Sequence, residues 1–153
     1  MARRFTTFAL PYDLVALAYP LVSAAVPTID LAGWQNFVQP MIAADPPGSA
    51  GAIGLRHEAG YLCGLMVYRT ERDLKHGRTL AVDFFVALDL VKETAAARAL
   101  LEAAEAKALE LHCAVIAIRL GIEQHALAHC VNAGGYRPSA KLYAKGVSRP
   151  LAN

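Results

Sequence analysis

The chain has 153 residues, of which 56% are apolar, and a formal net charge of +2 at pH 7. This length and apolar content are usual for one domain with a buried core, so we expect a single domain over residues 1–153. No apolar run approaches the roughly 18 residues of a membrane span, which excludes a membrane protein at this stage. The lysines and arginines are scattered singly, so the sequence predicts no nucleic-acid partner.

The first 25 residues imitate a secretory signal, because two arginines precede an apolar stretch with a small-residue ending. Pro11, Asp13 and Pro20 interrupt that apolar stretch, so we predict no signal peptide. The three cysteines, an odd number, lie in apolar surroundings, which is typical of buried thiols in a reducing compartment. The sequence therefore predicts a cytoplasmic protein.

The first half of the chain predicts two helices and a hairpin. Apolar spacing indicates a short helix over 13–23, which Pro20 must distort or end early, and a second helix over 31–44 with Asp30 as its cap. After a break at 45–51, two strands over 52–56 and 61–69 form a tight hairpin. A charged loop is expected over 69–77.

The second half predicts an alternation of strands and helices. The expected elements are a strand over 78–88, a helix over 94–111, a strand buried on both faces over 113–120, a helix over 123–133 ended by two glycines, and one or two short strands over 136–147. The full order predicts an α+β fold, with a mixed, mostly antiparallel sheet and helices on both faces.

The segment from Leu80 to Leu120 is the most informative for function. It reads as strand, loop, long amphipathic helix and strand, which gives a right-handed crossover. The loop that enters such a helix gathers free backbone N–H groups at the positive end of the helix dipole. The sequence therefore predicts a phosphate-binding site before this helix.

The order of elements, with the helix KETAAARALLEAAEAKALEL after a strand containing Val86, resembles the GNAT superfamily of acyl-CoA N-acyltransferases. The resemblance covers nearly the whole chain and is densest over 61–120. It implies that backbone groups of 84–86 hold the pantetheine arm of coenzyme A and that 92–97 receive its pyrophosphate. The cofactor-binding residues that it implies are Phe84, Phe85, Val86, Lys92, Glu93, Thr94, Ala95, Ala96, Ala97 and Gln124.

The loop departs from the family pattern. Lys92 stands where Gln or Arg is usual, and Ala95 replaces the first glycine, whose missing side chain lets the backbone approach the pyrophosphate. A polar-capped, alanine-rich helix is the plain structural alternative.

The catalytic residues also depart from the family pattern. Val131 occupies the position of the tyrosine that commonly acts as general acid in the family. Tyr143 is the substitute that we predict as general acid, with Cys130 and His129 as alternatives. Asp83, on the central strand, is the candidate base. By strict alternation it shares a face with Phe85 and Ala87, and an ion pair with a nearby arginine is its structural alternative.

The resemblance implies transfer of an acyl group, most simply acetyl, from acetyl-CoA to a primary amine by direct attack, with no metal. The aromatics of 12–44, with few acidic neighbours, indicate a small amine or amino-acid-like acceptor with an apolar part, and the resemblance makes a homodimer a further expectation. A noncatalytic binding or dimerisation module is the alternative, because the glycine loop and the tyrosine are both altered. A metal-dependent hydrolase using His125 and His129 is the third hypothesis.

Overall fold

The structure is a computed structural model, and it describes residues 4–88 and 95–148. Five strands form one sheet in the order β1-β2-β3-β4-β5, antiparallel except for the parallel pair β4–β5. The strands are β1 (Phe5–Ala9), β2 (Ala50–His57), β3 (Leu62–Asp73), β4 (Gly77–Ala87) and β5 (Val115–Ile118). The helices are η1 (Tyr12–Ala18), α1 (Tyr19–Ala25), α2 (Leu31–Ile42), α3 (Ala95–Glu110) and α4 (His125–Ala133).

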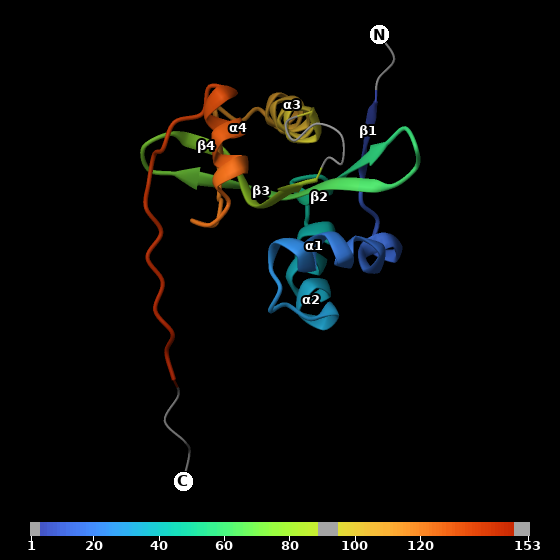
Figure 1. Cartoon of the computed structure of the whole chain (residues 1–153). Helices are drawn as coiled ribbons and strands as arrows, with labels where there is room; N and C mark the ends of the chain where they lie inside the picture. Colours follow the sequence, from blue (N-terminus) through green and yellow to red (C-terminus); the bar gives the residue numbers. More distant parts are fainter. Residues whose placement is uncertain (1–3, 89–94, 149–153) are drawn as a thin grey trace.

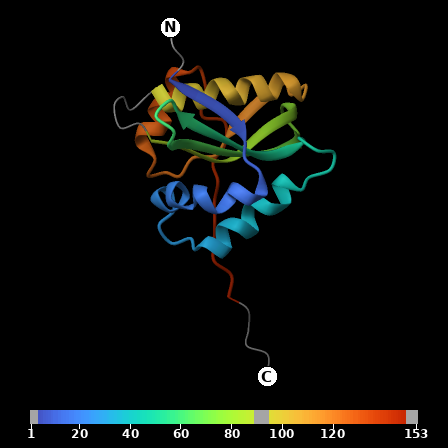
Figure 2. The same ribbon diagram turned by 90° about the vertical axis from the view of Figure 1, so that its right-hand side faces the viewer.

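Helices cover both faces of the sheet (Figures 1 and 2). On one face α3 and α4 pack on Leu80, Val82 and Phe85 of β4, and on the other η1, α1 and α2 pack on Phe84 and Val86. The predicted α+β class with a mixed, mostly antiparallel sheet is confirmed. No helix among the described residues is long and apolar enough to cross a membrane.

The N-terminal helices differ in detail from the prediction. A 3-10 turn precedes α1, and Pro20 lies in the first turn of α1, where its missing N–H has no helical partner to lose. The side chain of Asp30 caps α2 as predicted, accepting the N–H of Gly33 at 2.7 Å. Trp34 is 1% exposed and donates its Nε1–H to the carbonyl of Val15 at 2.8 Å, which fixes α2 against η1.

Strand β1 was not predicted, and the expected charged loop over 69–77 is mostly strand. β3 continues to Asp73 and β4 begins at Gly77, so only a tight turn separates them. The carboxylate of Asp73 accepts the N–H of His76 at 2.9 Å and stabilises that turn. Charged residues are tolerated there because this end of the two strands extends beyond the helices into solvent.

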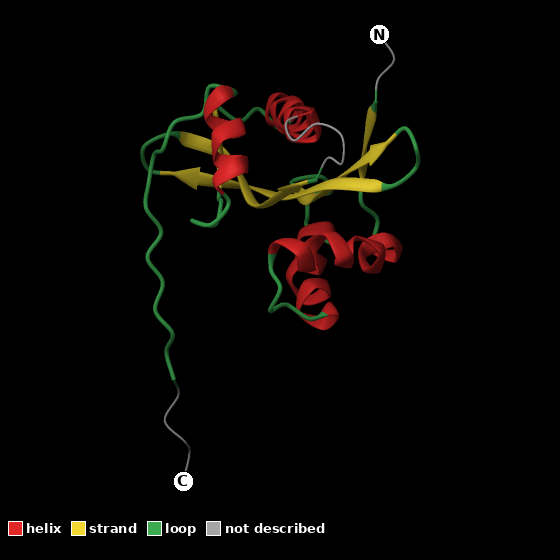
Figure 3. Ribbon diagram, viewed as in Figure 1, coloured by secondary structure: helices red, strands yellow, loops and turns green. Residues whose placement is uncertain are grey.

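Two predictions for the C-terminal part are wrong. β5 has only four residues, of which three are partly exposed and Ala117 is exposed, because it is an edge strand with β4 as its single partner among the described strands. Residues 136–148 form no strand, because no strand among the described residues lies beside them (Figure 3). None of the three cysteines forms a disulfide within the described residues; Cys63 is buried as expected, while Cys113 and Cys130 are only partly buried.

The ring of Tyr136 packs on the α3 side of the sheet, and its hydroxyl is buried without a hydrogen-bond partner in the part of the chain that the structure describes. Burial, with a smaller contribution from the charge of Glu105, raises the pKa of Tyr136 to about 12. An unpaired buried hydroxyl costs free energy, because it has lost its hydrogen bonds to water.

We predict that Tyr136→Phe raises the free energy of unfolding at pH 7 by about 1 kcal/mol in urea titrations. Because the folded pKa lies above the ordinary value of 10.0, the unfolded chain ionises first, and the wild type loses stability between pH 10 and about 12. In Tyr136→Phe, the part of this loss of stability that comes from ionisation of Tyr136 is absent. A variant that is less stable at pH 7 would show that the hydroxyl has a partner.

Candidate functional site

The central feature of the site is a β-bulge at Asp83 on β4. Val82 pairs with Tyr68 and Phe84 pairs with Val67, so Asp83 has no partner on β3. A bulge adds one residue to a strand and reverses the faces of the side chains that follow it. Val82 and Phe85 therefore share one face of the sheet, while Phe84 and Val86 lie on the other. The prediction by simple alternation that Phe85 and Ala87 oppose Val82 is therefore wrong, as is the prediction that Phe84 and Val86 share its face.

Strands β4 and β5 separate at the same point. Their parallel pairing ends where Val82 meets Ile118, and the last bond runs from the N–H of Arg119 to the carbonyl of Val82 at 3.0 Å. Beyond the bulge, β4 continues to Ala87 with β3 as its one strand neighbour. The part of β4 beyond the bulge thus has an open side toward α4.

The backbone groups that face this open side follow from the pairing. The N–H of Leu88 donates to the carbonyl of Cys63 at 2.7 Å, so Leu88 is directed at β3, and neighbouring strand residues alternate in direction. Ala87 and Phe85 therefore direct their N–H and C=O groups away from β3. The amide of Gln124 lies on that side, 3.5 Å from the carbonyl of Phe85.

A cavity of about 380 Å³, which we call the β4–α4 cavity, lies on this open side. Most of its wall is apolar, and its polar side chains come from the start of α4. Its lining residues are Ala24, Ala25, Val86, Ala87, Leu88, Glu123, Gln124, His125, Ala126 and Leu127. A second cavity of about 170 Å³, the α3–α4 groove, is lined by Arg98, Leu101, His129, Cys130, Ala133 and Gly134.

Gln124 joins the two sides of the opening. Its Oε1 accepts the N–H of Gly121 at 2.7 Å, while its Nε2 faces the carbonyl of Phe85. The side chain therefore links the loop after β5 to β4 where the two strands have separated. Gln124, which the family resemblance places beside the cofactor, lies in the wall of the β4–α4 cavity.

The predicted phosphate loop is described only in its last part, because Lys92, Glu93 and Thr94 lie outside the described residues. Ala95 begins α3, and Ala96 and Ala97 are buried with their methyl groups in the core on the α3 side. Neither of those two methyl groups points toward a ligand at the helix N-terminus. Ala95, the residue that stands in place of the family's first glycine, is partly exposed.

Asp83 forms an ion pair with Arg69. The Nε of Arg69 donates to Oδ2 at 2.6 Å and its NH2 to Oδ1 at 3.4 Å, and its NH1 donates to Glu71 at 2.7 Å. The hydrogen bond to Asp83, together with that to Glu71, raises the pKa of Arg69 above its usual value in spite of partial burial. The carboxylate of Asp83 is therefore occupied by a structural partner, and Asp83 lines neither cavity.

The candidates for the general acid are dispersed. Tyr143 is 85% exposed on the C-terminal segment and lines neither cavity. Cys130 and His129 line the α3–α4 groove, and Val131 is buried in the core. His125 and His129 border different cavities. Within residues 4–88 and 95–148, no group of three His, Cys, Asp or Glu side chains could hold a metal ion.

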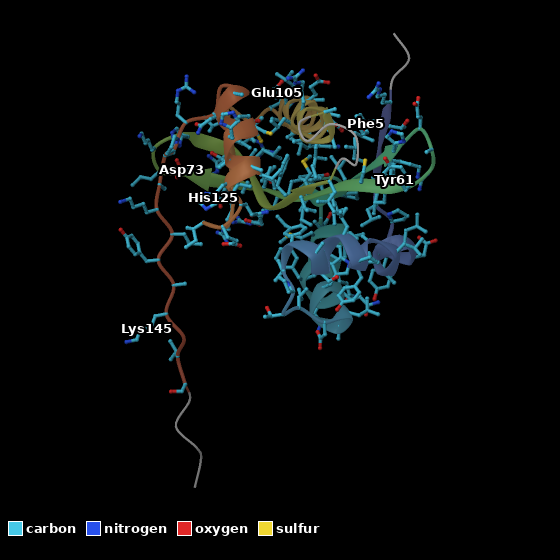
Figure 4. The ribbon with its side chains drawn as sticks, in the orientation of Figure 1. Phe5, Tyr61, Asp73, Glu105, His125 and Lys145 are labelled. Carbon is cyan, nitrogen blue, oxygen red and sulfur yellow. The ribbon has the colours of Figure 1, made fainter. Side chains whose placement is uncertain are left out.

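His125 and Arg98 are the residues that the sequence analysis did not assign to acyl transfer. His125 begins α4 and borders the β4–α4 cavity (Figure 4), and Arg98 lies in the first turn of α3 beside the α3–α4 groove. Each lies in the first turn of a helix that follows a strand, and that position is the sequence signal that could have found them. The aromatics expected in the acceptor wall, including the buried Trp34, line neither cavity.

The sequence matches no protein-family model and no curated protein. The structure does resemble solved acetyltransferases. The aminoglycoside N-acetyltransferase AAC(6')-Iy in complex with CoA aligns over 96% of this chain and 97% of its own, with a TM-score of 0.77 and 10% identity. AAC(6')-Ih from Acinetobacter baumannii aligns over 94% and 99%, with a TM-score of 0.75 and 9% identity. The ribosomal-protein-alanine N-acetyltransferase from Brucella melitensis biovar Abortus 2308 aligns over 94% and 99%, with a TM-score of 0.72 and 15% identity.

These likenesses extend over the whole fold and not over a single motif. The chain therefore has the fold of the GNAT superfamily, as the sequence resemblance implied.

Proposed function

We propose that this protein is an acyl-CoA-dependent N-acyltransferase that transfers an acetyl group to a primary amine. The observation that carries the proposal is the separation of β4 from β5 at the Asp83 bulge, which leaves the backbone of Phe85 and Ala87 facing a cavity of about 380 Å³. Free N–H groups on a fixed strand suit a thioester, because they polarise its carbonyl without moving during the reaction.

Coenzyme A would occupy two connected regions in this proposal. The pantetheine arm lies along the open side of β4, and the pyrophosphate of coenzyme A meets the first turn of α3, because the N-terminal end of a helix offers backbone N–H groups and a positive dipole to an anion. Arg98, one residue further on, supplies positive charge beside the α3–α4 groove. This arrangement compensates in part for the alanine at position 95.

In the reaction, the amine nitrogen attacks the thioester carbonyl carbon, the carbon–sulfur bond breaks, and the amine loses a proton while the sulfur leaves as a thiolate that is then protonated. His125 is the titratable side chain of the β4–α4 cavity that is suited to accept the amine proton, because Asp83 is paired with Arg69 and the Glu123 carboxylate folds over Gly121. Tyr143, predicted as the acid, lies on the exposed C-terminal segment.

The acceptor that fits this cavity is a small amine with an apolar part. Alanine, valine and leucine side chains form most of the wall, which suits an acceptor with an apolar part. One structure of AAC(6')-Iy holds a bisubstrate analog, CoA-S-monomethyl-acetylneamine, so this fold accommodates a small amine joined to CoA in that protein.

We predict that Ala87→Pro lowers kcat/KM by about 10²-fold, because proline removes an N–H that faces the cavity and takes no part in the β3 ladder. Ala87→Ser keeps the N–H and serves as the matched control, with activity close to that of the wild type. Calorimetry with acetyl-CoA, and with dephospho and desulfo analogues, measures cofactor binding separately from turnover. Wild-type protein that binds none of them at millimolar concentration would contradict the acyltransferase proposal.

Two further variants identify the proton acceptor. We expect His125→Gln to lower kcat by about 10²-fold, because glutamine cannot accept the amine proton. Asp83→Asn should lower the free energy of unfolding by about 1–3 kcal/mol, because it weakens the bonds from Arg69, with a much smaller effect on kcat. The reverse pattern would assign the base to Asp83, as the sequence analysis predicted.

The noncatalytic module remains the second candidate, supported by the buried Val131 at the tyrosine position. It predicts that coenzyme A binds without turnover of any amine, or does not bind.

A further inference from the structure

The side chain of Gln124 carries a primary amide into the gap between β4 and the loop after β5. Its Oε1 accepts the N–H of Gly121 at 2.7 Å, and its backbone N–H donates to the carbonyl of Gly121 at 3.0 Å. These two bonds hold the residue just before α4 begins. On the other side of the gap, Nε2 lies 3.5 Å from the carbonyl of Phe85, a long distance for a hydrogen bond. One end of the amide is therefore held by its own loop, and the other end makes a weak bond to β4.

This weak bond involves a carbonyl on the open side of β4. Pairing with β5 ends where Val82 meets Ile118, so no described strand provides an N–H for Phe85 on this side. The amide of Gln124 supplies the donor that a neighbouring strand would supply in a regular sheet. Gln124 also lines the β4–α4 cavity, so it occupies part of the surface that a ligand of β4 needs.

Coenzyme A presents the same chemical group to this surface. Its pantetheine arm contains secondary amides, each with an N–H and a C=O. The strand carbonyls that face the open side belong to Phe85 and Ala87, and an arm that lies along β4 directs its amide N–H groups at them. An amide of the cofactor and the amide of Gln124 therefore compete for the carbonyl of Phe85.

We propose that Gln124 is a latch that stands in for the cofactor: its Nε2 binds the carbonyl of Phe85 in the empty protein and moves away when the pantetheine arm enters. The inference rests on the proposed function, because it needs coenzyme A on the open side of β4. The latch opens readily, because the side chain is partly exposed and its bond to β4 is long. Its closed position lowers the apparent affinity for coenzyme A, because the protein binds the cofactor only when the latch is open.

The substitution Gln124→Asn tests the latch. Asparagine keeps an amide near Gly121, but its side chain is one methylene shorter and does not reach across the gap to Phe85. Calorimetry should therefore give a Kd for coenzyme A about three- to tenfold lower than that of the wild type, the change that loss of one competing hydrogen bond produces. The KM for acetyl-CoA should fall by the same factor. At saturating acetyl-CoA, kcat changes little, because the latch is already open in the complex.

Two further variants separate the latch from a general effect of substitution. Gln124→Met keeps the length of the side chain and removes its donor, so it should also bind coenzyme A more tightly if the shorter asparagine impairs folding. Gln39→Asn makes the same chemical change on the exposed surface of α2, away from both cavities, and should leave the Kd unchanged. Urea titrations verify that each variant is folded.

The side-chain NH₂ signals of Gln124 in a nitrogen-15 spectrum report the latch without turnover. They should move toward the positions of a freely exposed glutamine as coenzyme A is added. A Kd that is unchanged in both Gln124 variants overturns the latch, and a higher Kd would show that Gln124 holds the cofactor instead. If neither the wild type nor the variants bind coenzyme A, the proposed function fails together with the latch, whereas binding by the wild type without tighter binding by the variants refutes the latch alone.

Discussion

The extra residue at Asp83 is the constraint on which the site depends. By adding one residue to β4, it ends the regular pairing with β3 for one step, and the parallel pairing with β5 ends at the same place. Beyond the bulge, β4 forms strand pairing with β3 alone, and its other side stays open. Arg69 holds the carboxylate of the bulged residue, so the ion pair stabilises the distortion. A regular β4 would pair with β5 along its length and leave no cavity.

Two hydrophobic cores keep that opening rigid. Phe85, together with Ala96 and Ala97 of α3, belongs to one core, while Phe84 and Val86 pack against α1 and α2 in the other. The strand between them cannot rotate without disturbing both layers. Gln124 bridges from the loop after β5 to β4 across the gap. Backbone donors held in this way are suited to polarise a carbonyl, since no reorganisation is needed.

Periodicity predicted much of this fold, because the helix over 94–111 and the strand over 78–88 obey it. The bulge escaped prediction, since one added residue reverses the faces of Phe84 and Phe85 while the local sequence still reads as an ordinary strand. The last strand failed for another reason: its pattern is present at 140–147, but the described chain contains no strand that pairs with it. His125 was missed because only the fold brings the start of α4 to the end of β4.

The most direct test of the central claim is an amide spectrum of isotopically labelled protein titrated with coenzyme A. The account predicts that the N–H signals of Phe85 and Ala87 shift and exchange more slowly on binding, because these groups face the cavity. The signals of Phe84 and Val86, whose N–H groups are directed at β3, should change much less. Shifts in all four residues alike, or in none of them while coenzyme A binds, would contradict the claim that the open side of β4 holds the cofactor.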